Sequence, residues 1–165
     1  MVLPSKPNNG EEDTRGMLAY LGDADRGRGR FLPTTIDAMT GSTVDQLYVH
    51  AKIGIVDDRW LTIGSANFNA HSFFNDTEVN VQVNDRELAR GTRLRLWSEH
   101  LELPEHEIAG DPTDVVDQLW IPIAQRERER RRTGQRRTHR LRELTPSSRM
   151  LDRLLGPMDA IVVDG

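Results

Sequence analysis

Residues 46–65, QLYVHAKIGIVDDRWLTIGS, alternate between apolar and polar side chains over most of their length. This period of two predicts a β-strand that runs to Val56, then a short polar turn and a second strand from Trp60. Successive side chains of a strand point to opposite faces, so His50 and Lys52 share one face. The same face carries Tyr48, Gly54 and Val56, and the other face carries Leu47, Val49, Ala51, Ile53 and Ile55. The sequence therefore predicts an imidazole and an ammonium side by side, with an apolar layer behind them.

The elements around this segment follow from the same kind of pattern. Residues 76–83, DTEVNVQV, predict a third strand with Glu78 on the polar side and inward-facing Val79, Val81 and Val83. A helix is expected within residues 14–24, and a short strand within residues 31–38. We therefore expect the α/β class, with a mixed β-sheet flanked by helices.

Two further helices are expected after the third strand. Residues 84–103 begin with Asn84 as N-cap and Glu87 three residues later, which is a capping-box pattern. A second helix is expected to start at Asp111 and Pro112 and to be interrupted at Pro122. The final segment, residues 158–165, is expected to add one short strand.

The charge of the chain is divided unevenly. Residues 1–125 hold 11 Lys and Arg against 20 Asp and Glu, whereas residues 126–165 hold 11 against 6. We expect a folded domain over residues 1–125 and an Arg-rich extension over residues 126–165. Residues 126–142, RERERRRTGQRRTHRLR, predict a solvated, partly helical run, and contact with nucleic acid or an anionic membrane is the alternative.

The composition of the chain excludes cysteine chemistry and gives no sign of a secreted protein. The chain has no cysteine, which rules out disulfides, a thiolate nucleophile and any cysteine-based metal site. No apolar run approaches the length of a membrane span, and the first residues lack the pattern of a signal peptide. We expect a cytoplasmic or peripheral membrane protein.

The polar residues near His50 suit a phosphate diester. An imidazole supplies a nucleophile or a proton carrier, Lys52 supplies a compact cation, and Ser65 and Asn67 supply a hydroxyl and an amide donor. Gly64 allows close approach of the backbone. Glu78, on the next strand, is expected to orient the imidazole by accepting its other N–H. This chemistry needs no cofactor, and the sequence shows no metal-ligand cluster.

The spacing His50-x-Lys52-(x)4-Asp57-(x)6-Gly64-Ser65-x-Asn67 resembles the HKD signature of the phospholipase D superfamily with its GSxN extension. The resemblance covers about residues 1–103 and is nearest to bacterial two-motif phospholipase D and cardiolipin-synthase-like proteins, in the half that carries the second motif. It implies lipid phosphodiester hydrolysis or phosphatidyl transfer through a phosphohistidine. In this family one HKD histidine attacks phosphorus and the histidine of a second motif protonates the leaving alcohol. Asp57 belongs to the motif, and at a hairpin edge it is equally suited to capping the turn and to contacting Lys52.

The chain departs from the family pattern because it has one HKD motif. None of the other histidines has a lysine two residues later; these are His71, His100, His106 and His139. We expect a domain that is incomplete at its N-terminus and is one half of a two-motif site. The alternatives are an HKD nuclease that completes its site as a homodimer, and a non-catalytic remnant that binds anionic polymers or membranes. The expected partners are a phospholipid and a second HKD motif, from a preceding half or from a second copy.

Overall fold

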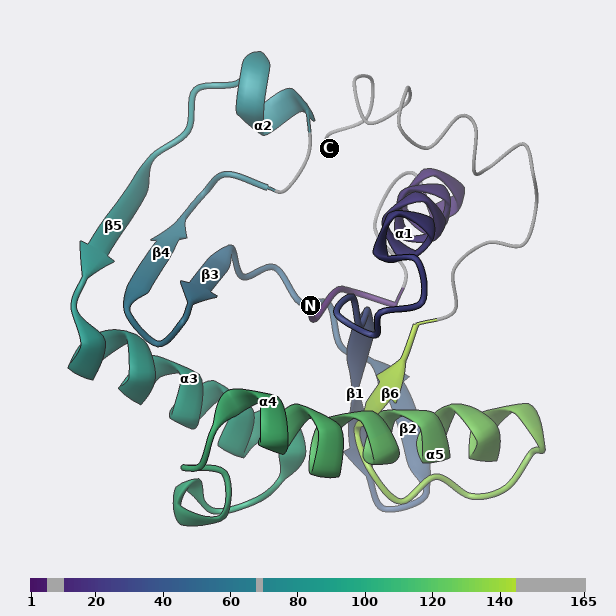
Figure 1. Ribbon diagram of the computed structural model, residues 1–165. Helices are drawn as coiled ribbons and strands as arrows, with labels where there is room; N and C mark the ends of the chain where they lie inside the picture. Colours follow the sequence, from purple (N-terminus) through teal and green to yellow (C-terminus); the bar gives the residue numbers. More distant parts are fainter. Residues whose placement is uncertain (6–10, 68–69, 145–165) are drawn as a thin grey trace.

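The computed structural model describes residues 1–5, 11–67 and 70–144, with the side chains of residues 11–14, 70 and 71 left out of the description. Its strands form two separate antiparallel sheets, in the orders β2-β1-β6 and β3-β4-β5. A parallel bridge between Val2 and Thr34 adds to the first sheet. Figure 1 shows the two sheets on opposite sides, with α3 at one end of the β3-β4-β5 sheet and α5 crossing in front of the strands β1, β2 and β6. The expected combination of strands and flanking helices is confirmed, and the strands are divided between two sheets.

The second sheet is built from the segment that opened the sequence analysis. Its strands are β3 (Ile53–Val56), β4 (Trp60–Gly64) and β5 (Asn80–Asn84). In its register, Ile53 pairs with Ile63 and Ile63 pairs with Val81, so these apolar side chains share one face. The three expected strands are present, but the first begins at Ile53, later than the alternation predicted.

The first sheet contains β1 (Thr34–Thr40), β2 (Thr43–Gln46) and β6 (Leu141–Glu143). Strand β1 and helix α1 (Glu11–Asp25) correspond to the strand and helix expected near the N-terminus. Strand β6 was not predicted. It pairs with β1 through residues that are about a hundred positions apart in the sequence, so a local pattern carries no sign of it.

Helix α3 (Arg86–Leu101) links the two sheets. It begins one residue later than predicted, because the side chain of Asp85, not Asn84, accepts the N–H of Leu88 at 3.0 Å. It ends at Glu102, whose backbone is left-handed. A single 3₁₀ turn (Glu105–Glu107) and the short α2 (Ala70–Phe74) complete the elements of this region.

The helix expected at Asp111 is present, but Pro122 does not end it. Helix α4 (Pro112–Val115) continues through a π-helical turn (Val116–Trp120) into α5 (Ile121–Arg132). The N–H of Ile121 bonds to the carbonyl of Val116, five residues earlier, which is the π-helical spacing. A proline is tolerated here because the π-helical turn directly before it widens the backbone spacing at the point where its ring and missing N–H would disturb a regular α-helix.

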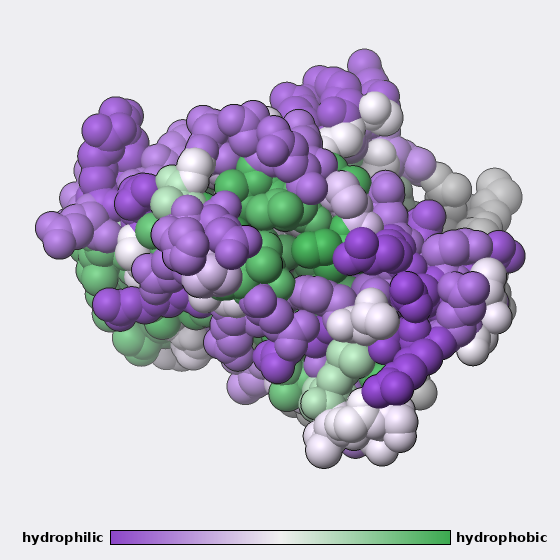
Figure 2. Space-filling view, turned by 90° about the horizontal axis from the view of Figure 1, so that it is seen from below, coloured by the Kyte–Doolittle hydropathy of each residue, from purple (hydrophilic) through white to green (hydrophobic). Residues whose placement is uncertain are grey.

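The main core lies between α3, the α4–α5 helices and the first sheet. Its buried members are Ile36, Leu94, Leu101, Ile108, Val115, Trp120, Ala124 and Leu141. Seen from the helical end, the surface carries an apolar patch surrounded by polar side chains (Figure 2). Because Ala124 and Leu141 belong to the core, the expected boundary at residue 125 falls inside α5, and residues 126–144 are packed against the rest of the fold.

Many charges of the arginine run are paired inside the protein. Arg137 and Arg142 both bind Asp37 in β1, and buried Glu127 accepts hydrogen bonds from the backbone and hydroxyl of Thr138. Burial alone would raise the pKa of Glu127, but these hydrogen bonds and the charge of Arg137 lower it overall. Most side chains of residues 126–142 are exposed and part of the run is helical, as predicted, but Arg137 and Arg142 are buried because Asp37 and Glu127 neutralise them. The expected strand at residues 158–165 lies outside the described residues.

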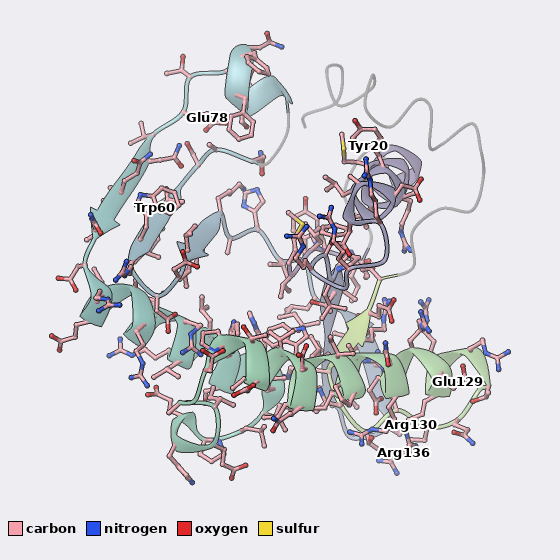
Figure 3. The ribbon with its side chains drawn as sticks, viewed as in Figure 1. Tyr20, Trp60, Glu78, Glu129, Arg130 and Arg136 are labelled. Carbon is pink, nitrogen blue, oxygen red and sulfur yellow. The ribbon has the colours of Figure 1, made fainter. Side chains whose placement is uncertain are left out.

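Exposed arginines of this segment are also engaged. Arg128 pairs with Glu143 at 3.0 Å, Arg132 pairs with Glu129 at 2.6 Å, and Arg140 pairs with Glu102 at 3.4 Å. Figure 3 shows Glu129, Arg130 and Arg136 near the far end of α5, away from the β3-β4-β5 sheet. These pairs leave fewer free positive charges for an outside polyanion than the sequence suggested.

Candidate functional site

His50 and Lys52 lie in an extended segment that leads into β3. Their side chains and that of Tyr48 line one pocket, whereas Val49, Ala51, Ile53 and Ile55 line a separate cavity. The predicted alternation is therefore confirmed, although residues 47–52 lie outside the regular strand. The N–H of Gly64 donates to the carbonyl of Lys52 at 3.2 Å and fixes this segment beside β4.

The pocket has a volume of about 490 Å³ and brings together most of the predicted site. It is lined by Tyr48, His50, Lys52, Gly64, Ser65, Asn67 and Asp76. The exposed ring of His50 stacks on Tyr48, with 5.9 Å between ring centroids and 27° between planes. The Lys52 ammonium donates to the carbonyl of His50 at 3.2 Å. An imidazole and a cation are thus held at the mouth of one polar pocket.

Gly64 is required by a close approach of two backbones. A Cβ at this position would lie 2.4 Å from the carbonyl oxygen of Val79 and 1.9 Å from Oδ1 of Asn80. The N–H of Ser65 donates to the same Val79 carbonyl at 3.0 Å, and the N–H of Val79 donates back to the Ser65 hydroxyl at 3.0 Å. The Gly-Ser-Ala-Asn turn is therefore fixed against the start of β5.

Glu78 contacts two serines. Its carboxylate accepts the hydroxyl of Ser65, and Figure 3 places it beside α2. The hydrogen bonds from Ser65 and then Ser72, followed by the charge of Lys52, lower the pKa of Glu78 although burial opposes them. Among the described residues, Glu78 makes no hydrogen bond with His50. Contrary to expectation, Glu78 therefore does not orient the imidazole in this arrangement, because its carboxylate accepts hydrogen bonds from the hydroxyls of Ser65 and Ser72.

Ser72 is a site residue that sequence reasoning missed. It is 8% exposed, and its hydroxyl oxygen accepts the N–H of Asn67 at 3.0 Å. Because Ser72 also bonds to Glu78, it connects the Asn67 end of the turn to the acidic residue. Its only sequence signal is its position between the turn and Glu78, and no spacing rule singles out a serine there.

Asp57 does not join this pocket. It lies in the β3–β4 turn with φ of 52° and lines the cavity on the other side of the sheet. Its neighbour Asp58 forms a bidentate ion pair with Arg93 of α3. The acidic turn thus anchors the hairpin to a helix through Asp58, and Asp57 stands apart from Lys52.

The second cavity lies on the face that carries the apolar layer. It has a volume of about 1050 Å³, and Ile53, Ile55, Trp97 and Trp120 contribute to its apolar lining. His100 also lines it, and burial lowers the pKa of this histidine, so its ring is neutral at neutral pH. His100 is therefore separated by the sheet from the His50 pocket.

The described part of the chain holds neither a candidate metal site nor a helix suited to crossing a membrane. Within residues 1–5, 11–67 and 70–144, no three His, Asp or Glu side chains form a group suited to holding a metal ion. No helix in those ranges is both long enough and apolar enough to cross a membrane.

Comparison with known proteins identifies a related family. Residues 24–97 match the family described as "Cardiolipin synthase, PLD-like domain". The chain is 44% identical to phospholipase D zeta 1 of Arabidopsis thaliana over 100 residues, which are 48% of this chain and 9% of that protein. It is 35% identical to phospholipase D alpha 1 of Spuriopimpinella brachycarpa over 131 residues, which are 66% of this chain and 16% of that protein.

A third relative gives the same result from another lineage. The chain is 33% identical to phospholipase D B of Dictyostelium discoideum over 96 residues, which are 48% of this chain and 8% of that protein. The chain thus spans less than a fifth of the length of these curated relatives. The family match, residues 24–97, includes every predicted site residue from His50 to Glu78.

Proposed function

Because residues 24–97 belong to the phospholipase D superfamily, we propose that the chain supplies one half of a phospholipase D-type phosphodiesterase site acting on phospholipid. The observation that carries the proposal is the pocket that gathers His50, Lys52, Ser65 and Asn67 on one side of the sheet. A phosphodiester presents two anionic oxygens and an electrophilic phosphorus, and this set offers a cation, polar donors and a nucleophile for them.

In the proposed reaction, an imidazole nitrogen of His50 forms a bond to phosphorus while the bond to the leaving alcohol breaks. The product is a phosphatidyl-histidine, and water or a second alcohol later displaces His50 to give phosphatidic acid or a new phosphodiester. Lys52 would neutralise charge on the non-bridging oxygens as it develops, and the amide of Asn67 would donate a hydrogen bond to them. The exposure of the His50 ring supports this role, because a nucleophile must reach the substrate.

Ser65 enters the proposal with a condition. Its hydroxyl proton is donated to Glu78, and its oxygen accepts the N–H of Val79. Ser65 can therefore donate to a phosphate oxygen only after its hydroxyl rotates away from Glu78. In the resting arrangement, Ser65 and Glu78 hold the turn in place, and the phosphate would compete for the serine.

The leaving alcohol needs a proton, and the described part of the pocket contains no second imidazole to donate it. Among the described residues, His50 is the only imidazole that lines it. His100 lines the other cavity, and His139 is held between the Leu101 carbonyl and the Leu141 N–H. We therefore assign the proton donor to a second HKD motif, from a preceding half or a second copy of the chain. A preceding half and a second copy would each supply an HKD histidine as the proton donor.

The test measures alcohol release from phosphatidylcholine and the covalent intermediate by mass spectrometry of the intact chain. His50→Ala should lower turnover at least about a hundredfold and abolish the lipid adduct. His106→Ala, which changes an exposed histidine of the 3₁₀ turn, should leave both unchanged. Turnover that survives in His50→Ala would contradict the proposal.

Light scattering and a second substrate separate the remaining alternatives. If the active species is a dimer, mixing wild type with His50→Ala should give a mixed dimer with reduced turnover. Cleavage of DNA with no cleavage of lipid would favour the nuclease instead. The internal ion pairs of Arg128, Arg132, Arg137 and Arg142 give that alternative little support.

A further inference from the structure

Two exposed phenylalanines stand beside the candidate phosphate pocket. Phe73 is 60% exposed and Phe74 is 85% exposed, both on α2, and their ring centroids lie 6.4 Å apart. Val79, which follows Glu78, is 73% exposed. We call Phe73, Phe74 and Val79 the apolar rim. Large apolar side chains that gather at such exposure mark an interaction surface more often than isolated ones do.

The apolar rim is fixed in position relative to the pocket. Ser72, directly before Phe73, is buried and accepts the N–H of Asn67 at 3.0 Å. Ser72 also bonds to Glu78, the residue before Val79. Both parts of the rim are thus attached to residues of the site through a single buried hydroxyl. Figure 1 shows α2 at the end of the β3-β4-β5 sheet that lies away from α3.

The occupant of the pocket determines what the rim would face. A phospholipid keeps its phosphate at the surface of the bilayer, immediately above the apolar acyl chains. A pocket that binds this phosphate must bring its edge against the membrane, and the edge formed by α2 and Val79 is apolar. Aromatic side chains at this depth are favourable because their rings leave water without a charge being desolvated.

The charges near the rim indicate how it would bind. Of the described side chains that line the pocket, Lys52 is the only lysine or arginine, and Asp76 and nearby Glu78 are acidic. This balance gives no strong attraction to anionic headgroups, so apolar insertion would supply most of the binding energy.

We infer that the apolar rim inserts into the surface of a phospholipid bilayer and presents the headgroup phosphate to His50 and Lys52. The inference rests on the proposed phospholipid substrate, and it adds the surface through which that substrate is reached. It distinguishes the rim from the arginine run, whose contacts with a membrane would weaken in salt.

The experiment uses the full chain and vesicles of phosphatidylcholine alone, with co-sedimentation at low and high salt. Phe73→Ser with Phe74→Ser should lower the partition coefficient at least about tenfold, since two aromatic rings would no longer leave water on binding. Phe73→Trp with Phe74→Trp should restore binding. Tyr20→Ser removes another exposed aromatic ring, 55% exposed on α1 and labelled in Figure 3, and should leave binding unchanged.

Three outcomes would overturn the inference. Wild type that does not bind vesicles, or a double serine variant that binds as wild type does, excludes membrane insertion of the rim. Binding that is lost in high salt but not in the serine variant assigns the membrane contact to basic residues. A wild-type dimer that the serine substitutions convert to a monomer, seen by light scattering, assigns the rim to contact between copies.

A water-soluble short-chain phosphatidylcholine separates this inference from the proposed function. Below its micelle concentration, turnover of this substrate should be unchanged by the two serine substitutions, because no membrane is involved. Vesicle binding without any turnover would support membrane insertion of the rim and contradict the proposed phosphodiesterase activity. Turnover of the short-chain substrate without vesicle binding would support the phosphodiesterase activity and contradict membrane insertion of the rim.

Discussion

The guanidinium group of Arg93 holds the carboxylate of Asp58 through two parallel hydrogen bonds, Nε to Oδ1 at 2.7 Å and Nη2 to Oδ2 at 2.8 Å. Arg93 lies in α3 and is buried, and its guanidinium carbon sits 4.7 Å from the ring centroid of Trp97. Asp58 occupies the β3–β4 turn with φ of 51°. The hairpin that carries the site is thus attached to the helix that also contacts the main core.

Arg93→Lys should destabilise this attachment. Lysine keeps the charge but not the planar fork, so one of two charge-assisted hydrogen bonds is lost, at a cost of about 2 kcal/mol in the free energy of unfolding. Urea denaturation measures the change. Arg95→Lys on the exposed side of the same helix should have almost no effect, and equal losses in the two variants would contradict the assigned role.

Gly64→Ala should disrupt the site by steric overlap. The added Cβ would lie 2.4 Å from the backbone oxygen of Val79, which cannot move without breaking the β4–β5 pairing. We expect a loss of about 2 kcal/mol or more in unfolding free energy, as for other overpacked positions, with loss of phosphate binding. Gly91→Ala is the matched control, since nothing lies within 4 Å of its added Cβ in α3 and alanine favours a helix. Stabilisation of Gly64→Ala would show that the two backbones are not held together.

Ser72→Ala should raise the pKa of Glu78. The Ser72 hydroxyl is the second-ranked cause, after Ser65, of the lowered pKa, so its removal destabilises the carboxylate form. Because the pKa is depressed in the fold, Glu78 favours the folded state above its ordinary pKa, and this contribution is lost as pH falls through the lowered value. In Ser72→Ala the contribution should be smaller, and its loss should be complete at a higher pH. Carboxyl ¹³C NMR titration measures the shift, and Ser42→Ala, in an exposed turn, should leave it unchanged.

Glu127→Gln should weaken the packing of α5 on the first sheet. Glu127 is 0% exposed and receives hydrogen bonds from Thr138 and the charges of Arg130 and Arg137. A neutral amide leaves Arg137 with less compensation, and the expected loss is about 3 kcal/mol in unfolding free energy. Glu129→Gln, two residues along the same helix and paired with Arg132 in solvent, should remain close to wild type. A small effect at Glu127 would mean that the buried cluster is not important for stability.

Sequence patterns predicted the features that depend on neighbouring residues. The alternation around His50 and Lys52 assigned them to one face, and the aspartate before Pro112 marked the start of α4. The position of Ser65 beside Val79 depends on the pairing of β4 with β5, which the predicted hairpin and third strand made plausible. Local spacing therefore predicted most residues of the pocket, but it did not assign Tyr48 or Asp76 to the site and did not predict the hydrogen bonds within it.

Features that depend on distant partners were missed. The arginine run appeared unsuited to a core because its acidic partner Asp37 lies about a hundred residues earlier in the chain. Pro122 appeared to end a helix because the π-helical turn before it has no sequence signature. Val79 and Val81 were expected to face inward, but both are exposed, and the main contacts of α3 with this sheet are with β3 and β4 and not with β5.

Strand β6 has a consequence for the order in which the protein acquires its shape during synthesis. Thr34 can bridge to Val2 early, but Thr35 and Ile36 receive their partners in β6 only when residues 141–143 have emerged from the ribosome. Until then, Asp37 has neither Arg137 nor Arg142 to neutralise it. The β3–β4 hairpin that follows His50 has all its strand partners by residue 84, so the nascent chain can assemble the candidate pocket well before its first sheet is complete.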